Sequence, residues 1–338
     1  MRITASDLET LATAALIARQ VPSETAAQMA REAVLAELLG KKTHGVGKLL
    51  SLNLGDPAAP VNIHAVGPLV TADGNSSNGY ALLRRLANMA VDVTREFGVA
   101  IVTARNFSRY SMLRPYTEIV AAAGYVGILM SSAGPAAVAP FGSADPITGT
   151  NPICLSFPSS SGIRTFDFST SKVVWGEIRQ AALEGRALPA DTFLNAAGAF
   201  TTRPEEVNAV LPFGGAKGSA LNVAIELLCG PLVGAKAGLE VESEFDLGAV
   251  LLSIDPARTG GSRSFAEAAA RLFKEIKQSR PLDPERQVRV PGEPRPQQGL
   301  DFDLATVEVE VRDNVINGLK AMSRGEWNAE MASNPLYN

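Results

Sequence analysis

Hydrophobic residues recur at helical spacing near the start of the chain. Leu8, Leu11 and Leu16 mark one face of a first helix. Ser6 and Glu9, three residues apart, have the pattern of a capping box at the start of that helix.

A second helix is predicted from Ser23 to about Leu38. Gly40 supplies its C-terminal stop, and Lys41 and Lys42 suit the negative end of the helix dipole. The segment that follows, T-H-G-V-G-K, therefore begins just beyond a helix end.

From Val61 onward, short β-type runs alternate with helical patterns and are separated by Pro, Gly and Asn. The predicted strands are Gly98–Ala104, Tyr125–Ser131, Ile153–Phe157, Arg164–Phe168 and Ala249–Ile254. The predicted helices are Ser77–Phe97, Met112–Ala123, Ser171–Leu183, Ala216–Cys229 and Ser264–Gln278, the last opened by a Ser264–Glu267 capping box.

The C-terminal part is less regular. Ser279–Leu300 holds five prolines and is predicted to be an extended connection. In Phe302–Met322 the valines first alternate as in a strand and then recur at helical spacing, which favours a helix from about Arg312.

Composition limits the class of protein. The chain has 338 residues, 46% hydrophobic and 20% charged, which predicts one large or two modest globular domains. The formal charge is -4 without long runs of one sign, so a nucleic-acid partner is not expected.

Location can be predicted from the same data. Cys154 and Cys229 lie in separate apolar segments, as buried thiols of a reducing compartment do. Asp7 and Glu9 interrupt any signal-peptide core, and no apolar run approaches the ~20 residues of a membrane span. We expect a cytoplasmic protein without a membrane partner.

Two nucleotide-binding motifs are not supported by the sequence. Gly40–Val46 resembles a P-loop, but the lysine and hydroxyl residue after the second glycine are replaced by Val46 and Gly47, and no strand precedes the segment. No G-x-G-x-x-G motif opens a helix after a strand, so a Rossmann site is not indicated. A nucleotide cofactor would have to bind in another way.

The candidate chemistry begins with His44, one of two histidines. Its ordinary pKa suits proton transfer, and Lys48 could orient an anionic substrate beside it. Taken alone, His44 is more often structural or solvated. With His64 as the only other imidazole, a metal site built from several histidines is excluded, and no metal is predicted.

Four further motifs bring small residues where a backbone can approach a ligand. The second and third of them, F-D-F-S-T-S and L-P-F-G-G-A-K-G, are expected to lead into helices whose N-terminal amides favour phosphate. Asp167 could equally be a plain helix cap, and Lys217 a solvated charge. The motifs are G-T-N-P (149–152), F-D-F-S-T-S (166–171), L-P-F-G-G-A-K-G (211–218) and V-P-G-E (290–293).

Together with T-H-G-V-G-K at 43–48, these motifs resemble the malate/L-lactate dehydrogenase family that is unrelated to the Rossmann-type enzymes. They occur in order over almost the whole chain. The resemblance implies an α+β fold of a non-Rossmann type, with a helical domain from both chain ends (1–60 with 301–338) and a largely antiparallel sheet domain covered by helices (61–300). It also implies a homodimer that binds NADPH or NADH.

By the same resemblance, His44 is the proton donor to the carbonyl or imine that hydride reduces, and Asp167 could keep the imidazole oriented. Thr43, Lys48, Arg109 and Thr150 fall at substrate-binding positions. The cofactor-contacting positions are Asp167, Phe168, Ser169, Thr170, Ser171, Lys172, Ala216, Lys217, Gly292, Glu293 and Pro294.

The chain departs from the family pattern at three places. Thr43 replaces serine and follows Lys42 instead of aspartate, and Lys48 replaces an arginine that would grip a carboxylate with two hydrogen bonds. Ser108 and Arg109 stand where many members have a second histidine, so that Arg109 would bind a second anionic group or polarise the substrate.

The sequence therefore predicts an NAD(P)H-dependent oxidoreductase that reduces a small carboxylate substrate, either a 2-oxo acid or a cyclic 2-imino acid. The missing second histidine and the 216–229 helix motif favour the imine, and the imine reductases favour NADPH. The alternative from another class is a catalytically altered member that acts as a ligand-binding or biosynthetic-assembly protein. Cofactor binding without turnover would distinguish it.

Overall fold

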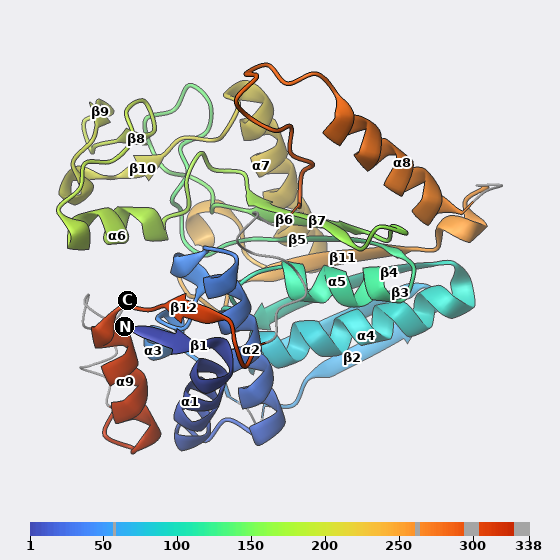
Figure 1. Cartoon of the computed structure of the whole chain (residues 1–338), viewed down its shortest axis with the longest axis horizontal. Coiled ribbons are helices and arrows are strands. Elements are labelled where there is room, and N and C mark those ends of the chain that lie inside the picture. The colour runs from blue at the N-terminus through green and yellow to red at the C-terminus, as the bar shows by residue number, and fades with distance from the viewer. Residues whose placement is uncertain (57–58, 261–263, 294–303, 328–338) are drawn as a thin grey trace.

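The computed structural model describes residues 1–56, 59–260, 264–293 and 304–327. A seven-stranded sheet forms the centre, with helices on both faces and a helical layer made from the two chain ends (Figure 1). This arrangement confirms the predicted α+β class.

The chain ends meet in a small two-stranded sheet. β1 (Arg2–Thr4) pairs antiparallel with β12 (Glu308–Glu310), and the amino group of Met1 lies 2.7 Å from Asp313 Oδ1. Helix α9 (Asp313–Ser323) then packs against α1 (Ala5–Ala18), beside α2 (Ser23–Leu38) and the short α3 (Lys48–Ser51). The layer that carries His44 is thus tied together by residues some 300 positions apart.

The cap of α1 differs from the prediction. Thr4, and not Ser6, accepts a hydrogen bond from the Asp7 amide at 3.1 Å, and its hydroxyl donates to Asp7 Oδ2 at 2.7 Å. The two patterns overlap in the sequence. Because β1 holds the chain extended up to Thr4, the helix begins at Ala5 and Ser6 lies inside it.

The central sheet has the order β2-β3-β4-β11-β5-β6-β7. Only β3 and β4 pair in parallel, through the crossover helix α4, and every other neighbouring pair is antiparallel. All five predicted strands are present. The bounds are β2 Asn62–Val66, β3 Leu69–Ser77, β4 Val99–Phe107, β5 Val126–Ser131, β6 Pro152–Phe157, β7 Arg164–Ser169 and β11 Gly248–Ile254.

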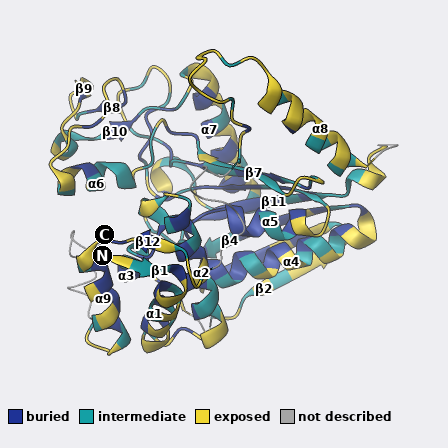
Figure 2. Cartoon of the chain, in the orientation of Figure 1, coloured by how far each residue is buried: buried dark blue, intermediate teal, exposed yellow. Residues whose placement is uncertain are grey.

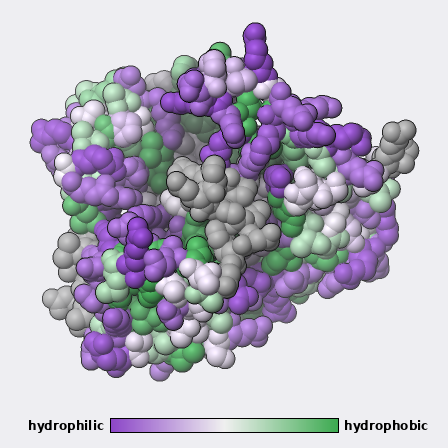
Figure 3. All heavy atoms as spheres, viewed as in Figure 1, coloured by the Kyte–Doolittle hydropathy of each residue, from purple (hydrophilic) through white to green (hydrophobic). Residues whose placement is uncertain are grey.

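Helices cover the sheet on both sides. α4 (Gly79–Phe97) and α5 (Arg114–Ala122) pack on one face, and α7 (Ala216–Cys229) packs on the other against β11 and β5 (Figure 1). α8 (Phe265–Gln278) lies at the outside with Ser264 as its N-cap, as predicted. Figure 2 shows the buried residues along the central strands and the inner side of α4. Figure 3 shows hydrophilic side chains over α8.

A smaller unit stands above the helical layer in Figure 1. It contains α6 (Gly176–Glu184) and a three-stranded sheet of β8 (Phe193–Leu194), β9 (Phe200–Thr201) and β10 (Ala209–Val210). The helix predicted from Ser171 begins five residues later. Backbone hydrogen bonds from Thr170 to Thr150 and from Lys172 to Leu211 hold this stretch extended.

One helix is apolar along most of its length. The window Ala216–Val233 has a mean hydropathy of 1.2 over 18 residues, enough in length and composition to cross a membrane. In the structure α7 buries Ile225 and Cys229 against β11 and β5, as the core helix of a globular domain does.

Candidate active site

His44 lies in a tight turn between two helices. α2 ends in a Schellman motif, in which the amides of Gly40 and Lys41 donate to the carbonyls of Glu37 and Ala36, and Gly40 has a φ of 70°. A single 3-10 turn, Lys42–His44, follows. The predicted glycine stop thus directs His44 out of the helical layer toward the sheet.

Two side chains fix the backbone of this turn. The buried carboxylate of Glu37 accepts a hydrogen bond from the Val46 amide at 3.0 Å, and Ser111 Oγ donates to the His44 carbonyl. A Cβ at Gly45 would lie 1.9 Å from Glu37 Oε1, so any larger residue would displace the carboxylate from its hydrogen bond to the Val46 amide. The turn is therefore rigid around His44.

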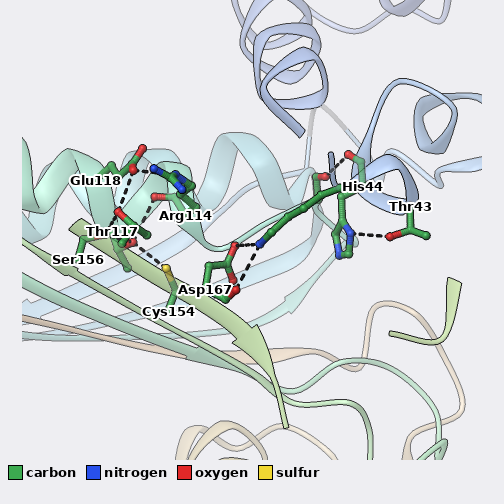
Figure 4. Close-up of polar contacts among 11 residues, drawn as sticks. Thr43, His44, Arg114, Thr117, Glu118, Cys154, Ser156 and Asp167 are labelled. Atoms are coloured by element: carbon green, nitrogen blue, oxygen red, sulfur yellow. Dashed lines mark hydrogen bonds and ion pairs between the residues drawn. The ribbon is translucent and has the colours of Figure 1, made fainter. Parts of the chain in front are cut away.

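The imidazole of His44 is held by its neighbour. Nδ1 lies 2.9 Å from Thr43 Oγ1 (Figure 4), and no hydrogen bond to Nε2 is formed by the part of the chain that the structure describes. Burial, followed by the charges of Lys48 and Lys41, lowers the pKa of His44 to about 3. In the unliganded protein the ring is neutral, and Nε2 is the atom that can face a substrate.

Lys48 supplies a cation beside His44. Its ammonium group donates to the Tyr110 carbonyl at 2.7 Å, and among the described residues no carboxylate lies within ion-pair distance. Burial and the charge of Arg109 lower the pKa of Lys48 to about 8, which Glu244 partly opposes. An ammonium group kept partly buried without a carboxylate is typical of an anion-binding site.

Asp167 is joined to the histidine turn through a lysine. Lys41 Nζ lies 3.0 Å from Asp167 Oδ2 and 3.3 Å from the Asp167 carbonyl oxygen. The Asp167 carboxylate thus pairs with Lys41, while Thr43 holds the His44 ring (Figure 4). Lys41 connects the turn to β7, the strand that enters the F-D-F-S-T-S motif.

Arg109 and Thr150, two further predicted substrate positions, make different kinds of contact. Arg109 is partly exposed, with Nε 3.9 Å from Glu244 Oε2. The carbonyl of Thr150 accepts hydrogen bonds from the amide and the hydroxyl of Thr170, both at 3.0 Å. Thr150 therefore serves as part of the backbone frame next to β7.

A buried polar network joins three of the sequence motifs. Asn222 on α7 donates to the Gly149 carbonyl at 2.9 Å and to Thr170 Oγ1 at 2.8 Å, and accepts from Thr148 Oγ1 at 2.5 Å. Asn151 reaches Glu226, one helical turn further along α7, at 2.5 Å. The network brings the G-T-N-P and F-D-F-S-T-S segments to the helix that follows L-P-F-G-G-A-K-G.

The N-terminus of α7 is open toward solvent. Its N-cap, Gly215, makes no side-chain cap hydrogen bond, and Gly214 and Gly215 both have a φ of 60°. Ala216 and Lys217 are exposed at the first turn. Among the described residues no side chain caps this helix start, and amides at such a start, next to a lysine, fit the diphosphate of a dinucleotide.

The predicted cofactor positions between Phe168 and Lys172 lie close to the N-terminus of α7. The Phe168 ring is exposed and packs edge-on against Phe213 with ring centroids 6.0 Å apart. Ser169 and Ser171 share a hydrogen bond of 2.8 Å, and Lys172 Nζ donates to the Asp191 carbonyl.

The segment around Gly292 packs along β7 from another direction. A Cβ at Gly292 would lie 2.5 Å from the Thr165 carbonyl oxygen, and the φ of Gly292 is 73°. Glu293 forms an ion pair with Lys277 on α8. Pro294, the last predicted cofactor position, lies outside the described residues.

Several site residues were not predicted from the sequence. Lys41 was interpreted only as a helix-end charge, and Glu37, Ser111, Asn222 and Glu226 were not singled out. A polar residue in an apolar helix pattern, such as Asn222 and Glu226 within Ala216–Cys229, is the signal that was available. Within the described ranges no group of His, Cys, Asp or Glu has a metal-binding arrangement.

His64 lies elsewhere. It lines a hollow of about 630 Å³ on β2, β3 and β4, together with Asp73, Arg105 and Leu232. This hollow shares none of the residues described above, which separates the two histidines and makes His64 a natural control for His44.

Replacing Asn222 with alanine should lower both stability and cofactor affinity. The change leaves the Thr148 hydroxyl and the Gly149 carbonyl without their buried partner, which costs about 1–3 kcal/mol for each unsatisfied group. Denaturant unfolding and cofactor titration measure the two effects. Asn88→Ala, at an exposed position of α4, is the control, and equal unfolding curves for the two variants would contradict the role of the network.

Comparison with known proteins places this site in context. A family model described as malate/L-lactate dehydrogenase matches residues 3–320. The L-sulfolactate dehydrogenase of Methanothermobacter thermautotrophicus is 30% identical over 294 residues, which cover 82% of this chain and 86% of that enzyme. The Delta(1)-pyrroline-2-carboxylate/Delta(1)-piperideine-2-carboxylate reductase of Pseudomonas syringae pv. tomato is 33% identical over 273 residues, 75% of this chain and 78% of that one.

Solved structures agree with the sequence comparison. The crystal structure of a dehydrogenase from Sinorhizobium meliloti superposes with a TM-score of 0.84 at 30% identity, covering 96% of this chain and 98% of that one. The match covers nearly the whole of both chains, so the overall fold is shared.

Proposed function

The chain belongs to the malate/L-lactate dehydrogenase family and is an NAD(P)-dependent oxidoreductase, and we propose that it reduces a 2-oxo acid or a cyclic 2-imino acid with His44 as proton donor. Relatives are named for sulfolactate, malate and pyrroline-2-carboxylate. All of these compounds carry a carboxylate next to the carbon that is oxidised or reduced.

The observation that carries the proposal is the Lys48 ammonium group beside His44. A substrate carboxylate on Lys48 would form the ion pair that none of the described carboxylates makes with this partly buried cation. Such a substrate would also bring its carbonyl or imine carbon next to the imidazole. Positioning of this kind is a large part of the rate enhancement that an enzyme can supply.

The residues at the cofactor positions fit a nicotinamide dinucleotide. The open amides of α7, with Lys217, would hold the diphosphate, and the hydroxyls of Ser169 and Ser171 lie on the extended stretch next to it. A reduced nicotinamide supplies the hydride when bound. NADPH is our choice over NADH, on the resemblance to the imine reductases.

His44 completes the reaction of a 2-oxo acid. Hydride addition leaves an alkoxide oxygen, which takes the proton from Nε2 of the imidazolium, while Thr43 Oγ1 keeps Nδ1 in place. Because the charges of Lys48 and Lys41 lower the pKa of His44, a bound carboxylate that neutralises Lys48 would raise it again. The substrate thereby favours the protonated form of the histidine that donates a proton to it.

The reaction is tested by the loss of reduced-nicotinamide absorbance, with NADPH and NADH in parallel, against 2-oxo acids and cyclic imino acids. We expect turnover with at least one member. Cofactor binding by calorimetry without turnover of any member would reject the proposal and favour the alternative, a catalytically altered family member that acts as a ligand-binding or biosynthetic-assembly protein.

Substrate affinity should depend on the charge of Lys48. With a pKa of about 8, the ammonium form predominates below that pH and is lost above it, so the KM for a carboxylate substrate should rise as the pH passes about 8. Lys48→Arg restores the residue type of the family and stays charged, because the guanidinium pKa is far higher. A KM that rises equally in the wild type and in Lys48→Arg would contradict this assignment.

We also propose that the protein is a homodimer in the cytoplasm. Support comes from apolar side chains on the exposed side of α7 and after it, including Val223, Leu227, Leu232 and Leu239. Light scattering should give twice the chain mass of 35.5 kDa. A mass equal to one chain at micromolar concentration would reject the dimer.

A further inference from the structure

The site holds a second cation that the reduction of a simple 2-oxo acid does not need. Arg109 immediately precedes Tyr110, whose carbonyl oxygen accepts the hydrogen bond from Lys48 Nζ. Its charge is one of the causes that lower the pKa of Lys48, so the two cations act on each other across the site. Two neighbouring like charges are costly unless anions lie between or beside them.

The guanidinium of Arg109 has a specific seat. A Cβ at Gly134 would lie 2.7 Å from Arg109 Nη2, and Gly134 has a φ of 81°. The left-handed backbone favours glycine at this position, and without a Cβ the guanidinium can lie close against it. Gly134 belongs to the loop that follows β5 (Val126–Ser131), so the arginine lies against this loop.

Glu244 is the carboxylate nearest to this arginine. The Oε2–Nε distance is 3.9 Å, at the outer limit of an ion pair, and both side chains are partly exposed, 42% for Arg109 and 30% for Glu244. A contact of this length between solvated groups contributes little free energy, so a well-placed anion can replace it. The planar guanidinium can offer two parallel N–H groups to that anion.

We infer that Arg109 binds a second anionic group of the substrate, and that Glu244 occupies the arginine in the unliganded protein and yields it on binding. This inference rests on the proposed function, because Lys48 holds the first carboxylate. The substrate class is then a 2-oxo acid with a carboxylate or sulfonate at its far end, and not the cyclic imino acid that the sequence pattern favoured. Arg109 and Glu244 determine specificity, while His44 and Lys48 perform the common chemistry.

The test compares two four-carbon substrates, oxaloacetate with two carboxylates and 2-oxobutanoate with one, in the presence of reduced cofactor. The wild type should prefer oxaloacetate in kcat/KM. Arg109→Met should lower kcat/KM about 10- to 100-fold for oxaloacetate, the loss of a charge-assisted contact, and less than about threefold for 2-oxobutanoate. Arg109→Lys should restore part of the preference.

Glu244→Gln gives the opposite prediction. Without the competing carboxylate, and at a pH well below 8 where Lys48 stays charged, the KM for oxaloacetate should fall by up to about fivefold, the range of an exposed ion pair, and the KM for 2-oxobutanoate should not change. Arg105→Met is the matched control, because Arg105 lies on β4 in an ion pair with Asp73, in the hollow that contains His64. It should leave both substrates unaffected.

The outcomes separate this inference from the proposed function. Equal losses for the two substrates in Arg109→Met, or a weaker binding of oxaloacetate in Glu244→Gln, would overturn the role of Arg109 while the reductase remains. If neither substrate is reduced, binding of malonate and propanoate to the cofactor-loaded protein decides. Tighter binding of malonate that is lost in Arg109→Met supports the second anion site, and equal binding of the two acids overturns it.

Discussion

Replacing His44 with alanine should lower kcat for reduction of a 2-oxo acid by about 10²–10⁴-fold, the usual contribution of a positioned general acid. The imidazole is the group that delivers the proton to the alkoxide oxygen, so its removal affects the chemical step. Glu37 and Ser111 hold the turn through hydrogen bonds to the backbone of Val46 and His44, and these survive the change, whereas the contact of Thr43 with the imidazole is lost. The fold should therefore be retained.

Cofactor affinity distinguishes this effect from a structural one. The predicted dinucleotide contacts lie on β7, α7 and the 290–293 segment, so His44→Ala should bind NADPH as the wild type does. His64→Ala is the matched control, because this exposed histidine of β2 lies in a separate hollow. An unchanged kcat in His44→Ala, or an equal loss in His64→Ala, would exclude His44 as the proton donor.

Replacing Lys48 with methionine should lower kcat/KM for a carboxylate substrate about 10- to 100-fold, with most of the change in KM. The methionine keeps an unbranched apolar stem but cannot form the charge-assisted contact, which is worth about 1.5–3 kcal/mol. An ester analogue should lose much less, because it presents no charge to Lys48. Lys42→Met, at the exposed lysine of the preceding turn, is the control and should resemble the wild type.

The same variant should change the titration of the histidine. Lys48 is, after burial, the largest cause of the low pKa of His44, so removal of its charge raises that pKa. The protonated form of His44 then persists to higher pH. The rate of reduction should therefore begin to fall at a higher pH than in the wild type. Equal activity of Lys48→Met toward the acid and its ester would be expected only if Lys48 does not bind the carboxylate.

Much of the fold followed from short-range patterns. The strand at Gly248–Ile254 and the helix at Ala216–Cys229 have continuous apolar or helical patterns, and both were predicted almost to the residue. β2 and β3 were not predicted. In β3 the buried residues include Val70, Ala72 and Gly74. These residues are small and polar residues lie between them, so the segment lacks the large β-branched and aromatic side chains that indicate a strand.

The site was only partly predictable for a different reason. His44 and Lys48 are close in sequence, and a resemblance to known motifs was enough to select them. The link from Lys41 to Asp167 joins residues 126 positions apart, and the pairing of Arg109 with Glu244 likewise depends on how the loops after β4 and before β11 meet. Spacing along the chain carries no information on such contacts, and so Asp167 was assigned to the imidazole without Lys41.

The pH dependence of kcat/KM for reduction and oxidation tests the central claim most directly, measured on the wild type and on His44→Gln. With a free-enzyme pKa of about 3, the protonated imidazole becomes tenfold scarcer with each pH unit, so reduction should fall tenfold per unit while oxidation stays level, up to about pH 8 where Lys48 loses its charge. In His44→Gln, water must supply the proton for reduction. In that variant kcat/KM for reduction should be level with pH, and kcat/KM for oxidation should change with pH instead. The same pH dependence in both proteins would contradict proton donation by His44.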